Sequence, residues 1–409
     1  MLGLLAFSAA GLHAQERNAL FIGNSYTYVN DLPGTTRLLA LSLGDTLNVA
    51  SSAPGGYTFE QHSTNATTLG LIASQPWDFV ILQEQSQRPS FPPSQVEQEV
   101  YPFAAQLVDS ILMNDSCTQP VFYMTWGRKN GDASNCGSWP PVCTYEGMQQ
   151  RLRESYLEMA YANDAFAAPI GMAWKKVRET HPFIELYNAD ESHPSPEGTY
   201  LAAAVFYSTL YRRPSIAATY AASLNADTAA ILRSIASSTV LDSLSTWNIG
   251  VNDPDASFTL VDQGGGNVQF THGGAGDHQW VFSDGGIATT ASPLQTFATG
   301  GLYSATHIWT DVCGRSDTAT AEFNLLIAGV GCHDAWPRPM IGAIGQGQVL
   351  IARDANSTGT IELFDPLGRH VQGIPITSTD RVVNCPSGLF IWRSVSSDGT
   401  IRAGRLVVP

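Results

Sequence analysis

The sequence has few charged residues and, beyond its first residues, no long apolar run. Charged side chains make up only 14% of the 409 residues, against about 25% in typical proteins, so uncharged polar side chains must cover much of the surface, as in many exported proteins. There are 21 Lys and Arg against 36 Asp and Glu, a net charge of −15. No basic surplus exists to neutralise phosphates, which argues against a nucleic-acid partner. No later apolar run reaches the roughly 20 residues that span a bilayer, so no transmembrane anchor is expected.

Cysteine is also scarce, with six in the chain. This number fits an oxidising compartment without demanding a disulfide scaffold. On local spacing, Cys136 could pair with Cys143 and Cys313 with Cys332, which leaves Cys117 and Cys385 free. No CxxC motif and no His/Cys spacing indicates zinc, so no metal site and no cofactor are predicted.

The N-terminus, residues 1–14, resembles a secretory signal peptide. An apolar core at residues 2–12 precedes a small-residue cleavage site after Ala14, and the first charges follow. The basic segment that usually opens such a peptide is missing, and a core strand or helix is the alternative. The resemblance implies export.

Residues 18–245 alternate between apolar strands and helical segments. Strands are expected at residues 19–22, 47–51, 79–83 and 121–126, and helices at residues 35–43, 96–113, 145–160 and 199–211. Apolar residues recur through 96–113 with the period of one helix face. Short, continuously apolar strands between such helices indicate a parallel sheet covered on both faces, an α/β fold.

Ser25 is the first candidate for chemistry, because the turn Gly23-Asn24-Ser25 ends the first expected strand. Ligands of α/β sheets bind at the carboxyl ends of the strands. The amide of Ser25 also heads the next segment and can donate to an oxyanion. The alternative is ordinary turn chemistry, since Gly, Asn and Ser dominate turns for backbone reasons.

Asp190 and His193 are the second candidate, three residues apart before an Ala-rich helix. At that spacing in a turn, the carboxylate can fix the tautomer of the imidazole and stabilise the imidazolium. Pro194 and Pro196 restrict the backbone beside the histidine. The alternative is helix capping by Asp190 or Ser195, with His193 as a surface loop residue.

Together, an early Gly-x-Ser and a late Asp-x-x-His are the signature that residues 18–245 share with the SGNH (GDSL-like) hydrolases, which they resemble. The resemblance implies a flavodoxin-like three-layer α/β/α fold with a mainly parallel sheet. It implies Ser25, Asp190 and His193 as the catalytic triad. The stretch SSAPGGYTFEQH resembles the family's second block, which makes Gly56, or else Gly55, an oxyanion-hole donor beside the amide of Ser25.

The third block of the family, G-x-N-D, is absent, and WDFVILQEQSQRP occupies its place. A glutamine amide can replace the asparagine amide as an oxyanion donor. Gln85 is the predicted donor, with Gln83 and Gln87 as rivals because the strand register is open by a residue or two. The alternative is a polar loop at the strand end. Glu84 could recognise a substrate hydroxyl or be solvated.

Residues 254–330 change to short alternating strands between Gly-rich turns, which is typical of a β-sandwich. The sequence WVFSDG at residues 280–285 and GLY at residues 301–303 resemble a PKD-type immunoglobulin-like module, with Ser283 in place of a glycine. An ordinary immunoglobulin-like sandwich is the alternative.

Residues 340–409 resemble the type A C-terminal sorting domain of the type IX secretion system. The matching stretches are residues 362–369, 387–391 and 405–408. The resemblance implies the secretion machinery as a partner, and a released or surface-anchored product. The chain is thus expected to be an α/β domain followed by two small all-β domains.

Other conspicuous residues have plainer interpretations. His62 could line the cleft, but a packing role is favoured. Trp126, Arg128 and Trp139, with the insertion between them, could form a sugar-binding rim, or the loop could merely cover the sheet end.

The predicted function is a secreted serine esterase acting on a small-molecule or glycan ester. A carbohydrate O-acetyl ester is the more specific hypothesis for its substrate. The alternative is a non-catalytic surface protein that binds glycans through a degenerate hydrolase domain. The altered third block favours the alternative, whereas the joint retention of Ser25, Asp190 and His193 favours the enzyme.

Overall fold

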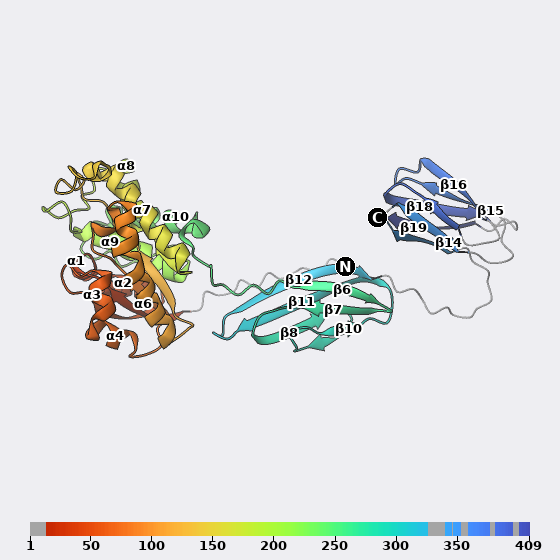
Figure 1. Ribbon diagram of the computed structural model, residues 1–409, viewed down its shortest axis with the longest axis horizontal. Coiled ribbons are helices and arrows are strands. Elements are labelled where there is room, and N and C mark those ends of the chain that lie inside the picture. Colours follow the sequence, from red (N-terminus) through yellow and green to blue (C-terminus); the bar gives the residue numbers. More distant parts are fainter. Residues whose placement is uncertain (1–13, 326–339, 346, 353–358, 377–380, 396–400) are drawn as a thin grey trace. The chain divides into compact units, whose positions relative to one another are not determined.

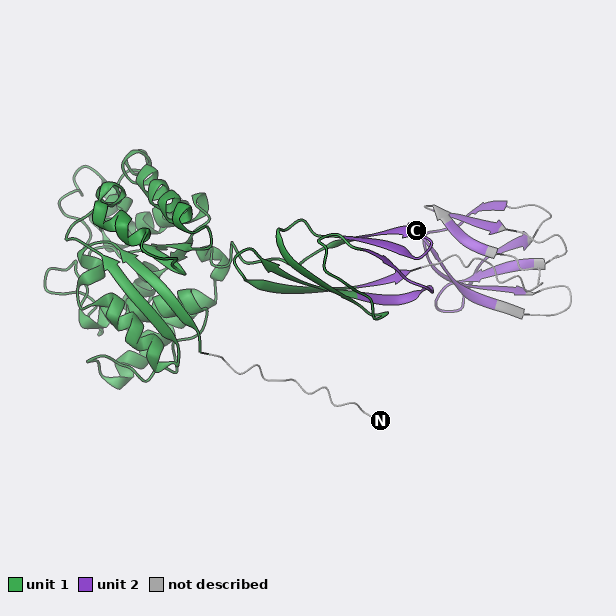
Figure 2. Cartoon of the chain, turned by 90° about the horizontal axis from the view of Figure 1, so that it is seen from below, with its two compact units in different colours: residues 1–259, 271–293, 305–321 green, residues 260–270, 294–304, 322–409 purple. Residues whose placement is uncertain are grey.

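The computed structural model describes residues 14–325, 340–345, 347–352, 359–376, 381–395 and 401–409. The chain divides into two compact units (Figure 2). The first unit comprises residues 1–259, 271–293 and 305–321, and the second comprises residues 260–270, 294–304 and 322–409. The expected signal peptide at residues 1–14 lies almost wholly outside the described residues. No helix among the described residues is long and apolar enough to cross a membrane.

A five-stranded parallel sheet forms the centre of the first unit, with helices around it (Figure 1). The strand order is β2-β1-β3-β4-β5, the flavodoxin-like order that places ligands at the carboxyl ends of the strands. The strands are β1 (Glu16–Ile22), β2 (Thr46–Ser52), β3 (Phe79–Leu82), β4 (Gln119–Tyr123) and β5 (Phe166–Ala168). All residues of β3, β4 and β5 are buried, as a sheet covered on both faces requires. The predicted α/β fold is confirmed.

The helices fall into two packed groups. Helix α2 packs against α9 and α9 against α10, whereas α3 and α4 pack against α6. Their bounds are α1 (Ser25–Tyr28), α2 (Leu32–Ser42), α3 (Phe59–Thr64), α4 (Ala66–Ile72), α5 (Pro93–Glu99), α6 (Tyr101–Asn114), α7 (Tyr145–Ala162), α8 (Ile170–Thr180), α9 (Pro196–Tyr211) and α10 (Ala226–Leu241). Helix α9 is buried from Gly198 to its end, because its small and apolar residues face neighbours on every side.

The helix expected at residues 96–113 is two helices. Helix α5 ends at Glu99 and α6 begins at Tyr101, with Val100 outside helical geometry. Pro102 stands in the first turn of α6, where its missing N–H costs nothing, but it cannot continue a preceding helix. The apolar period continues across Val100, so the sequence pattern did not reveal the break between the two helices.

Two antiparallel sheets follow the α/β part. Their strand orders are β10-β7-β6 and β12-β11-β8-β9. The bounds are β6 (Thr259–Gly264), β7 (Asn267–Thr271), β8 (Gly276–Phe282), β9 (Ile287–Ala288), β10 (Leu294–Thr296), β11 (Gly301–Asp311) and β12 (Ser316–Leu325). The prediction of a small all-β region after the α/β domain is confirmed.

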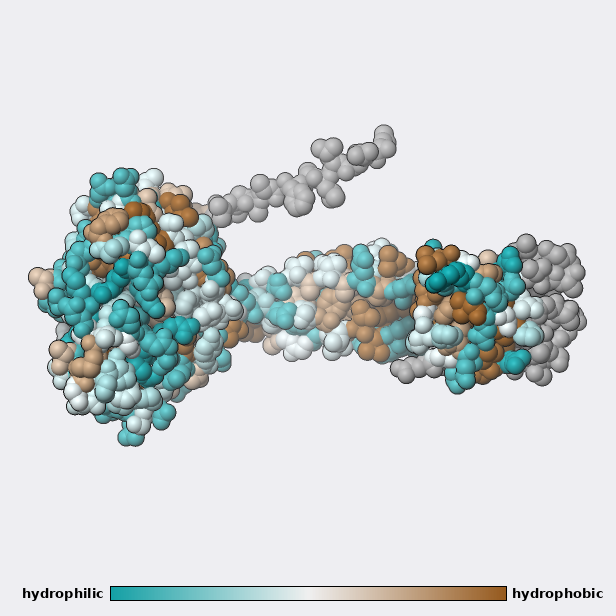
Figure 3. All heavy atoms as spheres, turned by 90° about the horizontal axis from the view of Figure 1, so that it is seen from above, coloured by the Kyte–Doolittle hydropathy of each residue, from teal (hydrophilic) through white to brown (hydrophobic). Residues whose placement is uncertain are grey.

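The C-terminal residues form two more antiparallel sheets, β13-β14-β17 and β16-β15-β18-β19. The bounds are β13 (Met340–Gly345), β14 (Gln348–Ala352), β15 (Gly359–Phe364), β16 (His370–Ile376), β17 (Arg381–Asn384), β18 (Gly388–Val395) and β19 (Ile401–Val408). A separate apolar core, which includes Val349, Ile361, Leu363 and Leu406, holds them. On the face seen in Figure 3, the α/β part is largely hydrophilic, and apolar side chains gather more on the all-β part.

The disulfides differ from the expected pairs in one case. Cys136 and Cys143 are bonded, as predicted. Cys313 is bonded to Cys117, not to Cys332, so that prediction is wrong; Cys332 lies outside the described residues. The bond joins the loop before β4 to the β11–β12 turn within the first unit, a pairing across 196 residues that local spacing cannot indicate. Cys385 is free and buried.

Candidate active site

Ser25 begins α1 directly after β1 ends, at the carboxyl edge of the sheet. The turn requires glycine at position 23, because a Cβ there would lie 2.4 Å from Thr27 Oγ1 and 2.5 Å from Gln83 Oε1. Asn24 caps the short helix, with its side-chain oxygen accepting from the Tyr26 N–H. The serine is therefore held at the end of a buried strand by a turn that allows little movement.

The side chain of Gln83 stabilises this turn through hydrogen bonds. This side chain is completely buried. Gln83 Oε1 accepts from the Asn24 N–H and from Thr27 Oγ1, both at 2.9 Å. Gln83 Nε2 donates to Asn24 Oδ1 at 2.9 Å and to the Glu84 carbonyl at 2.5 Å. Both amide hydrogens are used, so Gln83 is a positioning residue and is excluded as the rival oxyanion donor.

Asn24 and Glu84 fasten the Gly56 loop to the same edge. Asn24 Nδ2 donates to the Tyr57 carbonyl at 2.9 Å, a bond that an aspartate at this position could not make. Glu84 Oε2 accepts from the Phe59 N–H at 2.9 Å, and Glu84 Oε1 accepts from the Gln85 N–H at 2.5 Å. The loops that follow β1, β2 and β3 are thus joined by one buried polar network.

Neither interpretation of Glu84 from the sequence is correct. Glu84 is neither solvated nor open to a substrate hydroxyl, because its side chain is completely buried. Burial raises the pKa of Glu84 from its ordinary 4.5 to about 7, against the lowering effect of the amides of Phe59 and Gln85. The sequence could not show this, since a lone glutamate in a polar loop is usually exposed.

The turn that carries Asp190 and His193 precedes α9, as predicted. Asp190 Oδ1 accepts from the N–H groups of Ser192, at 3.1 Å, and His193, at 3.0 Å. A bridge between Tyr187 and Pro194 closes the base of the turn. The backbone of the turn is thereby fixed on both sides of the histidine.

Ser25, His193 and Asp190, which we call the Ser–His–Asp group, form one continuous hydrogen-bonded line. His193 Nε2 lies 2.8 Å from Ser25 Oγ, and His193 Nδ1 lies 2.5 Å from Asp190 Oδ2. Partial burial raises the pKa of Asp190, but the hydrogen bonds from the His193 ring and from two backbone amides outweigh it and lower the pKa overall. A carboxylate that stays ionised fixes Nδ1 as the protonated nitrogen and leaves the Nε2 lone pair facing the serine.

A stack of buried aromatic rings lies behind the histidine. Tyr26 stacks on Trp126 with ring centroids 4.7 Å apart, and Trp126 stacks on Trp174 at 3.7 Å. Trp126 Nε1 donates to the Ser192 carbonyl at 3.0 Å, and the Tyr26 hydroxyl lies 2.7 Å from Ser192 Oγ. The rings of Tyr26 and His193 also pack edge to face, with centroids 5.5 Å apart. The stack therefore positions the turn that carries the histidine.

This stack corrects one interpretation of Trp126. A completely buried ring cannot form a sugar-binding rim, so that interpretation of Trp126 is wrong. Trp139 donates its indole N–H to the Ser90 carbonyl at 3.0 Å, and Arg128 pairs with Asp132 at 3.3 Å. His62 is fully buried and bonds to the Gly23 carbonyl at 2.8 Å, so the favoured packing role is confirmed.

The expected oxyanion donors are the N–H groups of Ser25 and Gly56 and the side chain of Gln85. They lie on the loops after β1, β2 and β3, which the buried polar network joins. Gly56 has a φ of +72°, the left-handed region that favours glycine. Among the described residues, neither the Ser25 N–H nor the Gly56 N–H donates to a backbone acceptor.

The side chain of Gln85 folds back on its own loop. Gln85 Oε1 accepts from the Gln87 N–H at 2.8 Å, and Gln85 Nε2 donates to Gln87 Oε1 at 3.2 Å, which leaves one amide hydrogen. Gln87 Nε2 in turn donates to Asp132 at 2.7 Å. Gln85 as the third oxyanion donor therefore stays a prediction.

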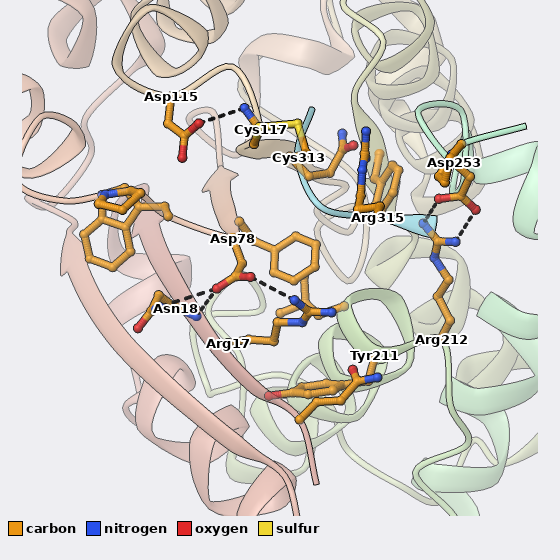
Figure 4. A pocket seen from close by; sticks show the side chains of 18 of the residues that line it. Arg17, Asn18, Asp78, Asp115, Cys117, Tyr211, Arg212, Asp253, Cys313 and Arg315 are labelled. Carbon is orange, nitrogen blue, oxygen red and sulfur yellow. Dashed lines mark hydrogen bonds and ion pairs between the residues drawn. A yellow bond between two sulfur atoms is a disulfide. The ribbon is translucent and has the colours of Figure 1, made fainter. Parts of the chain in front are cut away.

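A pocket of about 630 Å³ in the first unit lies away from this site (Figure 4). Its lining includes Arg17 and Asp78, at or next to the starts of β1 and β3, so it lies at the opposite edge of the sheet from Ser25. Ion pairs fill part of it: Arg17 donates to Asp78 at 2.9 Å, and Arg212 donates to Asp253 at 2.8 Å. None of the Ser–His–Asp group lines this pocket, and we do not assign it to the site.

Comparison with known proteins finds structural likenesses only. No model of a protein family matches the chain, and no curated protein matches it. A solved structure described as a candidate SGNH hydrolase, from Slackia heliotrinireducens, is 29% identical over 47% of this chain and 97% of its own, with a TM-score of 0.39. A DUF4886 family protein from Bacteroides uniformis is 17% identical over 55% of this chain and 95% of its own, with a TM-score of 0.47.

The PKD1 domain of the metalloprotease PrtV from Vibrio cholerae is similar to a shorter stretch. It is 29% identical over 18% of this chain and 96% of its own length, with a TM-score of 0.17. The α/β fold follows from the strand order of this chain, and the candidate active site follows from the distances within the Ser–His–Asp group.

Proposed function

We propose that this chain is a serine hydrolase that cleaves carboxylic esters. Ser25 is the nucleophile, His193 the general base, and Asp190 the group that orients the histidine. The observation that carries the proposal is the hydrogen-bonded line from Ser25 Oγ through the imidazole to the carboxylate. A serine hydroxyl is a weak nucleophile, and a base within about 2.6–3.2 Å activates it.

The reaction proceeds in two halves. Ser25 Oγ attacks the ester carbonyl carbon while its proton passes to His193 Nε2, and Asp190 stabilises the imidazolium. The oxyanion accepts hydrogen bonds from the N–H groups of Ser25 and Gly56, and Gln85 supplies the third donor. Collapse of the intermediate releases the alcohol, which takes the proton from His193. Water then attacks the acyl-enzyme with His193 as the base again, and the acid leaves.

A carbohydrate O-acetyl ester is the substrate that the surroundings of the triad favour. Glu191 lies two residues before His193. Asn130 Nδ2 donates to the Glu191 carboxylate at 2.8 Å, and the Lys129 N–H donates to the Glu191 carbonyl at 3.0 Å. The half-buried Gln87 adds a further polar side chain and donates to the buried carboxylate of Asp132 at 2.7 Å. Polar side chains around the nucleophile suit a polyhydroxylated alcohol and a short acyl group better than a long alkyl chain.

The test compares wild type with Ser25→Ala on 4-nitrophenyl acetate, 4-nitrophenyl octanoate and acetylated xylo-oligosaccharides. We expect wild type to release acetate from the oligosaccharide and to prefer the acetate ester, and the variant to lose at least about 10³-fold in kcat. Equal rates in the two proteins would contradict the hydrolase proposal. A preference for octanoate would leave the esterase standing and overturn the carbohydrate assignment.

We further propose that the protein is exported and carried to the cell surface or beyond by the type IX secretion machinery. The Cys117–Cys313 and Cys136–Cys143 disulfides support an oxidising compartment. Deletion of residues 340–409 in a bacterium with this machinery should retain the protein in the periplasm, as measured by immunoblotting of cell fractions. Unchanged export would contradict the proposal.

A further inference from the structure

Three histidines lie together in the all-β part of the first unit, far along the chain from the Ser–His–Asp group. They are His272, directly after β7, His278 on β8, and His307 on β11. One ring nitrogen of each lies within 4.8 Å of the others. His278 and His307 are buried, and His272 is half-buried.

Strand pairing explains why His278 and His307 meet. β8 and β11 are antiparallel, with His307 opposite Trp280 and Trp309 opposite His278. Residues directly opposite share a face of the sheet, and so do residues two apart on one strand. The two histidines are therefore diagonal neighbours on the buried face. Their rings are nearly parallel, with centroids 5.3 Å apart.

Each of the three rings has one nitrogen at a backbone carbonyl. His307 Nδ1 lies 2.8 Å from the Ala256 carbonyl, His278 Nε2 lies 3.2 Å from the Gly274 carbonyl, and His272 Nε2 lies 3.1 Å from the Asp255 carbonyl. Because a carbonyl oxygen only accepts, these nitrogens carry the hydrogens. The arrangement is the one in which metal-binding histidines are normally held, with the outer N–H donated to a backbone carbonyl.

These tautomers leave two lone pairs facing each other. The free nitrogens are then Nε2 of His307 and Nδ1 of His278, and they lie 3.1 Å apart. The other tautomer of His278 would instead point its lone pair at the Gly274 carbonyl. A cation between the rings removes the conflict. The third ring contributes Nδ1 of His272, which accepts a hydrogen bond from the Gly274 N–H at 3.2 Å and would exchange that weak bond for the ion.

We propose that His272, His278 and His307 bind a divalent transition-metal ion, with zinc as the natural probe. Two nitrogens bound to one tetrahedral zinc at about 2.0–2.1 Å are roughly 3.4 Å apart, close to the 3.1 Å between His278 and His307. The ligand nitrogen of the half-buried His272 lies within 4.8 Å of the other two. Three imidazoles without a thiolate suit zinc, copper or nickel, and the fourth position is left to water or an outside ligand.

Binding would join segments that are distant in the sequence. The ion would connect β8, β11 and the residue after β7, and the carbonyls of Asp255 and Ala256 would be fixed through the outer N–H groups. The sequence predicted no metal site because the ligands have no recognisable spacing; only strand pairing brings them together.

The test titrates ZnCl₂ into the full chain after removal of metals with EDTA, by isothermal titration calorimetry. We expect one zinc per chain in wild type and an affinity at least about 10–100-fold weaker in His272→Gln. His272 is half-buried, so this variant leaves the buried rings in place. His181→Gln, at another half-buried histidine, is the matched control and should bind zinc as wild type does.

A second variant separates this site from the triad. His193→Ala should retain the zinc affinity of wild type whether or not the protein hydrolyses esters. Equal affinity in wild type and His272→Gln, or loss of binding in His193→Ala, would overturn the proposal. As a second readout, zinc should raise the unfolding temperature of wild type and not that of His272→Gln; an equal rise in both would contradict the site.

Discussion

The contribution of Glu84 to the stability of the α/β domain should fall as pH rises from about 4.5 to 7. In the unfolded chain this carboxyl ionises near its ordinary pKa of 4.5, whereas burial raises the pKa to about 7 in the folded protein. A raised folded-state pKa means that the native protein binds the proton more tightly, so the contribution to stability is fully present below pH 4.5. It is lost as pH rises through 7.

The size of the effect follows from the two pKa values. They differ by about 2.5, and each pKa unit corresponds to about 1.4 kcal/mol, so the contribution of Glu84 to the free energy of unfolding should fall by about 3 kcal/mol across this range. The carboxyl is completely buried, so solvent screening does not reduce this figure. Against a total stability of about 5–15 kcal/mol, the change is easily measured.

The assay is urea unfolding followed by circular dichroism at 222 nm between pH 4.5 and 8. All helices of the described chain lie between Ser25 and Trp247, so this signal reports on the α/β domain. Wild type should lose about 3 kcal/mol more than Glu84→Gln, which cannot ionise. Glu97→Gln, at an exposed position of α5, should behave as wild type. An equal pH dependence in wild type and Glu84→Gln would show that Glu84 does not ionise with a raised pKa in the folded protein.

The other predictions concern the triad, the oxyanion hole and the long-range disulfide. Asp190→Asn should lower kcat by about 10⁴-fold, because the amide no longer holds the reactive tautomer of His193; a loss under tenfold would contradict the role of Asp190. Gln85→Ala should lower kcat about 10²–10³-fold with an unchanged unfolding midpoint, and an unchanged kcat would remove Gln85 from the site. Replacement of both Cys117 and Cys313 by serine should cost about 3–5 kcal/mol in urea unfolding, since the bond closes a loop of 196 residues; no change would show that the bond does not constrain the unfolded chain.

Local patterns predicted the α/β fold and the places of Ser25 and His193. Continuous apolar runs identified the first four strands, and turn residues identified both loops, because these signals depend on near neighbours in the sequence. The short strand β5 has only three residues and gave no such signal.

Features that depend on distant partners were not predictable. The Cys117–Cys313 bond spans the α/β and all-β parts of the sequence. Glu84 is a polar residue in a polar stretch, and only the backbone amides of Phe59 and Gln85 make its burial tolerable. The role of Trp126 behind the histidine turn likewise arises from stacking on Tyr26, a hundred residues earlier.

Covalent labelling shows whether Ser25 is a nucleophile that His193 activates. A fluorophosphonate reacts only with an activated serine, and peptide mass spectrometry locates the adduct. We expect a single adduct on Ser25 in wild type and at least about 10³-fold slower labelling in His193→Ala. Labelling at another serine, or equal rates in the two proteins, would contradict this role of Ser25.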